Sequence, residues 1–308
     1  MTTSFGIIII GDEILSGKRA DKHLPKVIEL LHARGLALSY ADYVGDDPAR
    51  IKATLARAFA AARVSGDVVF SCGGIGATPD DHTRQCAAAA WGTELALHPE
   101  AKILITSRMQ DVAQEQGVAF DPDRPDNVHR LDMGLFPVGA QIIPNPYNKI
   151  PGFSCFAARE ISPVQQEPRD GLSQSAGAAA PSGGSDPHAV GERGGLHFLP
   201  GFPVMAWPMI EWVLDTHYSH LHQTSAYVEK SIIVFGSMEA TLTPLMLDIE
   251  ATHPGVKVFS LPSVDHATYG RHIELGVKGA PDAVALAYPA MLNGLGAFDF
   301  KLGPELVR

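Results

Sequence analysis

The chain has 308 residues and a formal net charge of −10, because 34 Asp and Glu outnumber 24 Lys and Arg. Hydrophobic residues make up 45% of the chain and charged residues 19%, a balance typical of folded globular proteins that excludes wholesale disorder. An acidic chain without a cluster of Lys and Arg repels phosphate backbones, so we expect no nucleic-acid partner.

The N-terminal segment predicts a cytoplasmic protein with no membrane partner. Residues 5–10 are an apolar run of six residues, which is too short to span a bilayer and lacks the basic region and cleavage site of a secretory signal. The three cysteines, Cys72, Cys86 and Cys155, form no C-x-x-C pair. We therefore expect neither a disulfide scaffold nor a structural zinc site.

The first third of the chain repeats a strand–helix pattern. The predicted strands are Phe5–Ile10, Leu36–Val44 and Val68–Phe70. The predicted helices are Leu24–Leu31, a helix opened by Asp47-Pro48, and a helix over Cys86–Trp91. This alternation predicts an open, three-layer α/β domain with right-handed crossovers.

The loops that follow the three predicted strands all combine glycine with acidic residues. They are residues 11–17, 45–47 and 71–84. Ligands of such sheets bind outside the carboxyl ends of the strands, so we expect the site there. The third loop contains three glycines ahead of a helix, which predicts backbone N–H groups that hold an anion. Its Asp80 and Asp81 either cap that helix or face a cation or a hydroxyl-rich ligand.

A low-complexity segment interrupts the middle of the chain. Residues 161–195 are mostly Gly, Pro, Ser and Ala, which predicts a disordered insertion. It separates two predicted strands, Phe153–Phe156 and Leu196–Leu199, that a short hairpin would otherwise join. An apolar-rich helix is predicted over Val204–Tyr218. The insertion is therefore interpreted as an expanded loop and not as a domain boundary.

The last part of the chain, residues 223–308, predicts a small α+β domain. Its expected elements are strand Val228–Phe235, helix Glu239–Ala251, strands Val256–Leu261 and Arg271–Val277, and helix Pro281–Leu295. No glycine clamp for nucleic acid accompanies them. We therefore expect this domain to serve packing or dimerisation, and the chain to form a homo-oligomer.

The strand-end motifs resemble the MoaB/Mog (molybdopterin-binding) domain. They are Gly11-Asp12-Glu13, Gly45-Asp46, and Gly73-Gly74-Ile75-Gly76-Ala77-Thr78-Pro79-Asp80-Asp81 followed by Thr83. Further matches follow in family order at Pro144-Asn145-Pro146, Pro151-Gly152-Phe153 and Leu199-Pro200-Gly201-Phe202-Pro203. The resemblance is greatest to the competence/damage-inducible protein A (CinA) type. It implies a MoaB/Mog-like domain over residues 1–222 and a KH-like domain over 223–308, without the amidase domain or deamidase activity of full-length members.

The resemblance also implies a site and a ligand. It implies that the glycine loop binds a phosphate of a small ligand, either a pterin or a dinucleotide. The implied ligand-binding residues are Gly73, Gly74, Gly76, Thr78, Asp12, Glu13, Thr83, Pro200 and Gly201. The implied catalytic residues are Asp46, Asp80 and Asp81, of which Asp46 and Asp81 would hold a divalent cation such as Mg²⁺ or Co²⁺.

Two functions fit this resemblance. One is a metal-dependent pyrophosphatase that acts on ADP-ribose-like or FAD-like dinucleotides. The other is a module that binds molybdopterin or a nucleotide without turnover, in molybdenum cofactor metabolism. Arg84 and Lys18 either neutralise phosphate oxygens or are solvated at the surface.

Three places in the sequence depart from the family pattern. Ala77 stands where proline is usual, and His23 stands where an asparagine often follows an aspartate. The third departure is Tyr147-Asn148-Lys149-Ile150, which replaces a small Gly-Thr-type turn. We therefore expect a ligand pocket that differs from the family pattern.

Overall fold

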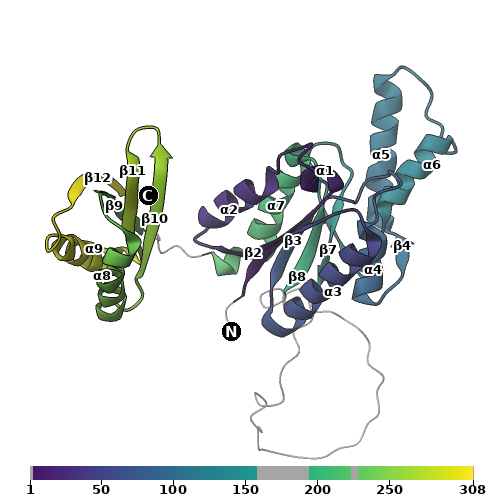
Figure 1. Cartoon of the computed structure of the whole chain (residues 1–308). Helices are drawn as coiled ribbons and strands as arrows, with labels where there is room; N and C mark the ends of the chain where they lie inside the picture. Colours follow the sequence, from purple (N-terminus) through teal and green to yellow (C-terminus); the bar gives the residue numbers. More distant parts are fainter. Residues whose placement is uncertain (1–2, 158–193, 223–227, 308) are drawn as a thin grey trace, which may run out of the picture. The chain divides into compact units, whose positions relative to one another are not determined.

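The computed structural model describes residues 3–157, 194–222 and 228–307 (Figure 1). The chain divides into two compact units, Met1–His222 and Gln223–Arg308. The predicted disordered insertion lies outside the described residues, apart from its last two positions.

Unit 1 is built on a six-stranded mixed sheet with the strand order β2-β1-β3-β8-β7-β6. These strands are β1 (Phe5–Ile10), β2 (Leu38–Val44), β3 (Val68–Cys72), β6 (Gln141–Ile143), β7 (Gly152–Phe156) and β8 (Gly195–Leu199). Strands β2, β1, β3 and β8 are parallel neighbours, while β7 is antiparallel to both β8 and β6. The predicted mixed α/β fold and the predicted pairing of the two strands that flank the insertion are therefore confirmed.

Helices cover both faces of this sheet (Figure 1). Helices α2 (His23–His32) and α7 (Pro203–His217) lie on one face, and α3 (Pro48–Ser65) and α4 (Thr83–Trp91) lie on the other. Successive side chains of a strand point to opposite faces, so Ile7 packs with α2 and α7 while Ile8 packs with α3 and α4. All six residues of β1 are buried, as its continuous apolar run predicts. None of the helices within the described ranges is both long and apolar enough to cross a membrane.

The chain between α4 and β6 forms an arm that projects from unit 1 and that was not predicted (Figure 1). It consists of β4 (Leu95–Leu97), α5 (Pro99–Glu115), α6 (Pro125–Leu131), the 3₁₀ turn η1 (Asp132–Gly134) and β5 (Leu135–Pro137). Strands β4 and β5 pair antiparallel. The three buried residues of α5, Ala101, Ile105 and Met109, are spaced four apart, which is a narrow apolar stripe.

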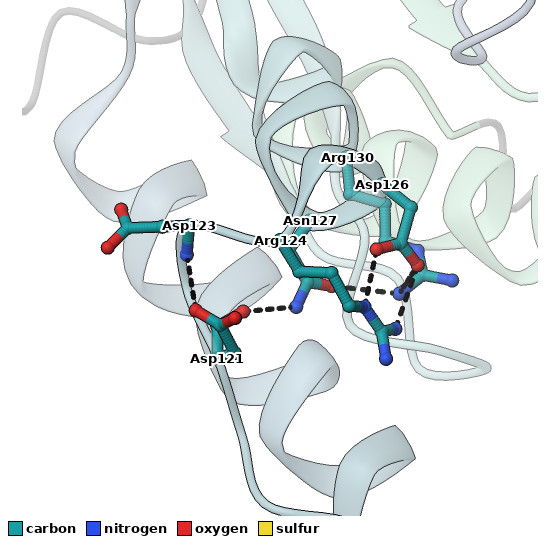
Figure 2. Close-up of polar contacts among 6 residues, drawn as sticks. All are labelled: Asp121, Asp123, Arg124, Asp126, Asn127 and Arg130. Carbon is teal, nitrogen blue, oxygen red and sulfur yellow. Dashed lines mark hydrogen bonds and ion pairs between the residues drawn. The ribbon is translucent and has the colours of Figure 1, made fainter.

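Figure 2 shows the polar contacts at the start of α6. The Arg124 guanidinium donates to both carboxylate oxygens of Asp126, at 2.5 and 2.8 Å. The Asn127 amide donates to the carbonyl oxygen of Asp121 at 2.7 Å, and the Asp121 carboxylate accepts the backbone N–H of Asp123 at 3.0 Å. Exposed ion pairs contribute only about 0.2–1 kcal/mol, so these contacts shape the α5–α6 loop more than they stabilise the fold.

Unit 2 is an antiparallel sheet with two helices. Its elements are β9 (Val228–Phe235), α8 (Glu239–Thr252), β10 (Lys257–His266), β11 (Gly270–Gly279), α9 (Pro281–Leu295) and β12 (Lys301–Val307). The strand order is β10-β11-β9-β12, and apolar side chains of α8 and α9 form one core with the sheet. The sequence analysis missed β12, which is mostly exposed and contains Pro304, as an edge strand permits.

Candidate functional site

A cavity of about 400 Å³ lies where the parallel strands of unit 1 end. The loops after β1, β2, β3 and β8 each contribute lining residues, among them Gly11, Asp46, Gly73 and Pro200. The parallel strands run in the same direction, so their carboxyl ends meet at one edge of the sheet. The predicted loops therefore converge on one cavity.

The loop segment Gly74–Ala77 presents a row of free backbone donors to this cavity. Among the described residues, none accepts a hydrogen bond from these four consecutive N–H groups. All four residues line the cavity. Successive N–H groups in a turn form a concave site for an anion, as the glycine spacing predicts.

Thr83, the first residue of α4, holds the start of this loop from the side away from the cavity. Its hydroxyl donates to the carbonyl oxygen of Gly73 and its backbone N–H donates to that of Gly74, both at 3.0 Å. Thr83 is fully buried and is not among the residues that line the cavity. Its implied role as a ligand contact is therefore corrected to one of holding the loop.

Arg84 holds the next two carbonyl groups of the loop. Its Nη1 donates to the carbonyl oxygens of Ile75 and Gly76, the latter at 2.6 Å. Arg84 is only 4% exposed, and this burial lowers the pKa of its guanidinium, while the charges of Asp81 and Asp132 oppose that shift. The interpretation of Arg84 as a solvated surface residue is wrong, because Arg84 is buried. Arg84 does not line the cavity either, so its charge can act on a bound phosphate only through the loop and not by direct contact.

The hydrogen bonds that hold the carbonyl groups of residues 73–76 explain why the N–H groups of residues 74–77 are free. The N–H and C=O of a peptide unit lie in one plane and point in opposite directions. When Thr83 and Arg84 bind four successive carbonyls on one side, the neighbouring N–H groups face the other side, where the cavity lies. The Arg84 charge beneath the loop adds a favourable field for an anion.

Replacing Arg84 with methionine is expected to weaken binding of inorganic pyrophosphate by about tenfold, because two loop carbonyls lose their donor and the buried charge disappears. Isothermal titration calorimetry measures this change. Arg57→Met is the matched control, since Arg57 is exposed on α3 and does not line the cavity. Equal affinity in the two variants would contradict the role given to Arg84.

Asp81 closes the far end of the loop. Its Oδ2 accepts the backbone N–H of Thr78 at 2.8 Å and the Thr78 hydroxyl at 2.6 Å. A Cβ on Gly76 would lie 2.6 Å from the same oxygen, so a larger residue there would push the Asp81 carboxylate away from its present position. Helix α4 begins after His82 without a side-chain cap, so the capping interpretation of Asp80 and Asp81 is wrong. Asp80, Asp81 and Thr78 all line the cavity.

Asp12 and Asp46 join the first two loops by a reciprocal pair of hydrogen bonds. The backbone N–H of Asp12 donates to Asp46 Oδ2 at 2.9 Å, and that of Asp46 donates to Asp12 Oδ1 at 3.2 Å. The pKa of the Asp46 carboxyl lies above its ordinary value, mainly because burial removes water from it. The hydrogen bond from the Asp12 N–H opposes this rise, while the negative charges of Asp12, Glu13 and Asp80 add to it. These four acids also line an open pocket together with Lys18, which therefore lies beside the acids. Asp12 lines that pocket and not the main cavity.

The two implied cation ligands, Asp46 and Asp81, both line the main cavity. Each already commits its Oδ2 to a hydrogen bond within the protein. Over the described ranges, no three His, Cys, Asp or Glu side chains are grouped closely enough to hold a metal ion. This donor set does not form a cage made by the protein alone. It suits an ion such as Mg²⁺, which takes one or two carboxylates and completes its shell with phosphate oxygens and water.

Several lining residues had no assigned role in the sequence analysis. They are the apolar Met133, Ile150 and Met205 and the polar Arg19, Asn145 and Asn148. The Asn-containing motif after β6 and Met205, which closely follows the Leu199–Pro203 motif, were recognised as family matches without a role, whereas Met133 comes from η1 and carries no local signal. Pro200 and Gly201 line the cavity, and the ring of the buried His23 hydrogen-bonds the carbonyl of Gly201 at 3.0 Å.

The fold and this site define a class: a three-layer α/β protein with a glycine loop of free amides at the carboxyl ends of its parallel strands. A family model described as "Probable molybdopterin binding domain" matches residues 6–220. The chain belongs to this family, and the resemblance stated from its motifs is confirmed.

Relatives of the chain carry CinA-type names. A "CinA-like protein" of Mycobacterium tuberculosis (strain ATCC 25618 / H37Rv) is 26% identical over 282 residues, which are 90% of this chain and 56% of that protein. A "CinA-like protein" of Mycobacterium marinum is 33% identical over 149 residues, which are 48% of this chain and 34% of that protein. The chain thus spans about half the length of the Mycobacterium tuberculosis relative.

Two solved structures match most of the chain. The crystal structure of the protein CinA from Thermoplasma acidophilum is 22% identical, with a TM-score of 0.47, and covers 69% of this chain and 98% of its own. The crystal structure of the molybdopterin biosynthesis enzyme MoaB from Thermus thermophilus is 17% identical, with a TM-score of 0.37. The match covers 71% of this chain and 96% of the MoaB chain.

Proposed function

We propose that the chain binds a small phosphate-bearing ligand, a pterin or a dinucleotide, in the cavity of unit 1. The single observation that carries this proposal is the row of four free N–H groups over Gly74–Ala77. A phosphate accepts hydrogen bonds from such a row, and the buried Arg84 beneath it stabilises the negative charge. The cavity volume of about 400 Å³ lies within the usual range of small-molecule sites.

The remaining walls of the cavity suit a flat ring attached to the phosphate. Met133, Ile150 and Met205 supply apolar surface, and thioethers pack favourably against aromatic rings. Arg19 adds a cation at the rim for a second phosphate or another acidic group. A pterin also agrees with the description of the family to which the chain belongs.

We expect the full chain to bind inorganic pyrophosphate, ADP-ribose and molybdopterin at one shared site. Molybdopterin should bind at least about tenfold more tightly than pyrophosphate, because its ring also buries apolar surface. Calorimetric titration measures the affinities, and competition between pyrophosphate and the larger ligands tests whether the site is shared. Failure of all three ligands to bind at millimolar concentration would refute the proposal.

Hydrolysis of a phosphoanhydride is a second candidate function, favoured by the open acidic pocket beside the cavity. Asp46 and phosphate oxygens of the ligand would hold a divalent cation, which when bound lowers the pKa of a coordinated water. In the overall reaction a P–O bond to the water oxygen would form, the bridging P–O bond would break, the bridging oxygen would leave with the other phosphate, and the proton lost by the water would pass to that phosphate or to solvent. Two monophosphates would be released.

One experiment separates binding from hydrolysis. The protein is incubated with ADP-ribose or FAD and with Mg²⁺, Co²⁺ or EDTA, and release of AMP is followed. Metal-dependent release that Asp46→Asn abolishes supports hydrolysis, whereas ligand binding without release supports binding alone. In Asp46→Asn the side-chain oxygen can still accept the backbone N–H of Asp12, so the variant removes the charge while the first two loops stay joined.

A further inference from the structure

Asn148 is held in one orientation at the wall of the cavity. Its Oδ1 accepts the backbone N–H of Ile150 at 3.1 Å and the amide of Asn145 at 2.8 Å. A backbone N–H can only donate, so the side-chain atom facing it must be the oxygen. The NH₂ group of Asn148 is therefore on the opposite end of the amide.

Contacts of the neighbouring residue Lys149 keep the Asn148 loop in this shape. Lys149 has a φ of 63°, which is strained for a residue other than glycine. Its ammonium group binds Asp111 at 2.5 Å and Ser107 at 3.1 Å, both on α5, and its backbone N–H donates to the carbonyl of Asn145 at 3.1 Å. The arm thus anchors the loop and leaves Asn148 pre-organised.

The NH₂ group of Asn148 has one weak partner within the described residues. It lies 3.6 Å from the Sδ of Met205, and a thioether is a poor acceptor. Asn148 and Met205 both line the cavity, together with Met133 and Ile150. The NH₂ group of Asn148 thus lies among apolar side chains and lacks a good acceptor. A hydrogen-bond acceptor on a bound ring can supply one.

We propose that Asn148 is a specificity determinant, whose NH₂ group recognises a ring carbonyl on the heterocycle of the bound ligand. This inference rests on the proposed binding of a phosphate-bearing ligand, and it ranks oxopurine-type or pterin-type rings above the 6-aminopurine ring that ADP-ribose carries. A ring that carries an amino group at the same place would set donor against donor and leave both unsatisfied. The chain would therefore select a 6-oxo ring over a 6-amino ring.

The test compares inosine 5′-diphosphate with adenosine 5′-diphosphate, which carry a carbonyl and an amino group, respectively, at ring position 6. In the natural chain we expect the inosine ligand to bind about tenfold more tightly. In Asn148→Asp the retained oxygen still accepts from Ile150, while the second oxygen replaces the donor by an acceptor. The preference should then disappear or reverse. The added negative charge weakens both ligands alike and cancels in the ratio.

Inorganic pyrophosphate separates the two proposals, because it has no ring. If the natural chain does not bind pyrophosphate, the proposed function fails. If it binds pyrophosphate but shows no preference between the two nucleotides, or a preference that Asn148→Asp leaves unchanged, the role of Asn148 is refuted.

Two further variants control this experiment. Tyr147 lies on the same loop, is 61% exposed and does not line the cavity. Tyr147→Phe should therefore leave the preference for the inosine ligand unchanged. Thermal melting and pyrophosphate binding report whether Asn148→Asp is folded. If it is not, Asn148→Ala takes its place, and there the ratio of the two affinities should fall to about one, since the donor is lost. A tenfold preference that persists in the alanine variant would overturn the proposal.

Discussion

Replacing Gly73 with alanine is expected to weaken pyrophosphate binding by about 100-fold and to lower the free energy of unfolding of unit 1 by about 3 kcal/mol. Gly73 has a φ of +111°, which side chains rarely adopt. A Cβ there would lie 2.2 Å from the carbonyl oxygen of Ile10, the last residue of the buried strand β1. Strand β1 packs against helices on both faces of the sheet, so it cannot move without disturbing the packing on both sides. The loop must shift instead, and its free N–H groups then leave their positions. Calorimetry measures the affinity and chemical denaturation the stability.

Gly92→Ala is the matched control for this variant. Gly92 also has a positive φ, +82°, but a Cβ added to it would have no atom within 4 Å, and it ends α4 away from the cavity. Alanine there should cost about 1 kcal/mol from backbone strain alone and leave pyrophosphate affinity unchanged. Loss of affinity in both variants to the same degree would show that general destabilisation, and not the position of the loop, controls binding.

Unit 1 is expected to lose stability as the pH falls below about 6.5, because its core holds a neutral histidine. His197 is fully buried and hydrogen-bonds Ser154 at 2.8 Å and the Tyr218 hydroxyl at 2.9 Å. Desolvation, assisted by the charge of His217, lowers the pKa of His197 to about 3. Between pH 6.5 and 3 the unfolded chain takes up a proton that the folded chain cannot. The expected loss between pH 8 and pH 5 is about 2 kcal/mol, or about 30-fold in the folding equilibrium.

Denaturation followed by tryptophan fluorescence measures this loss, because all three tryptophans, Trp91, Trp207 and Trp212, lie in unit 1. His197→Gln removes the titrating group while keeping an amide that can bond its neighbours. It should be less stable than the natural chain at pH 8 but should lose about 2 kcal/mol less between pH 8 and pH 5. The exposed His220→Gln is the control and should follow the natural chain. Parallel curves for the natural chain and His197→Gln would contradict the assignment.

The elements that sequence reasoning missed share one physical feature. Helix α5 buries only Ala101, Ile105 and Met109, and β12 is mostly exposed, so neither carries the broad apolar periodicity that marks a half-buried element. Contacts with segments that are distant in the sequence decide their structure. For example, β12 at the end of unit 2 pairs with β9 at its beginning. The arm that contains α5 matters for the site, because it anchors Lys149 and so positions Asn148.

The parallel strands, the family and the convergence of the glycine-containing loops could all be predicted from the order of residues. A buried parallel strand must be apolar along its whole length, and a loop that brings amides close to a ligand needs glycine, so both features are local in the chain. Which side of each loop residue faces the cavity became clear only in the folded chain. Folding placed Thr83 and Arg84 against the carbonyls of the loop, committed one oxygen of Asp81 to Thr78, and set the donor end of Asn148 beside Met205. These orientations depend on hydrogen-bond partners that are distant or unmarked in the sequence, and no local pattern specifies them.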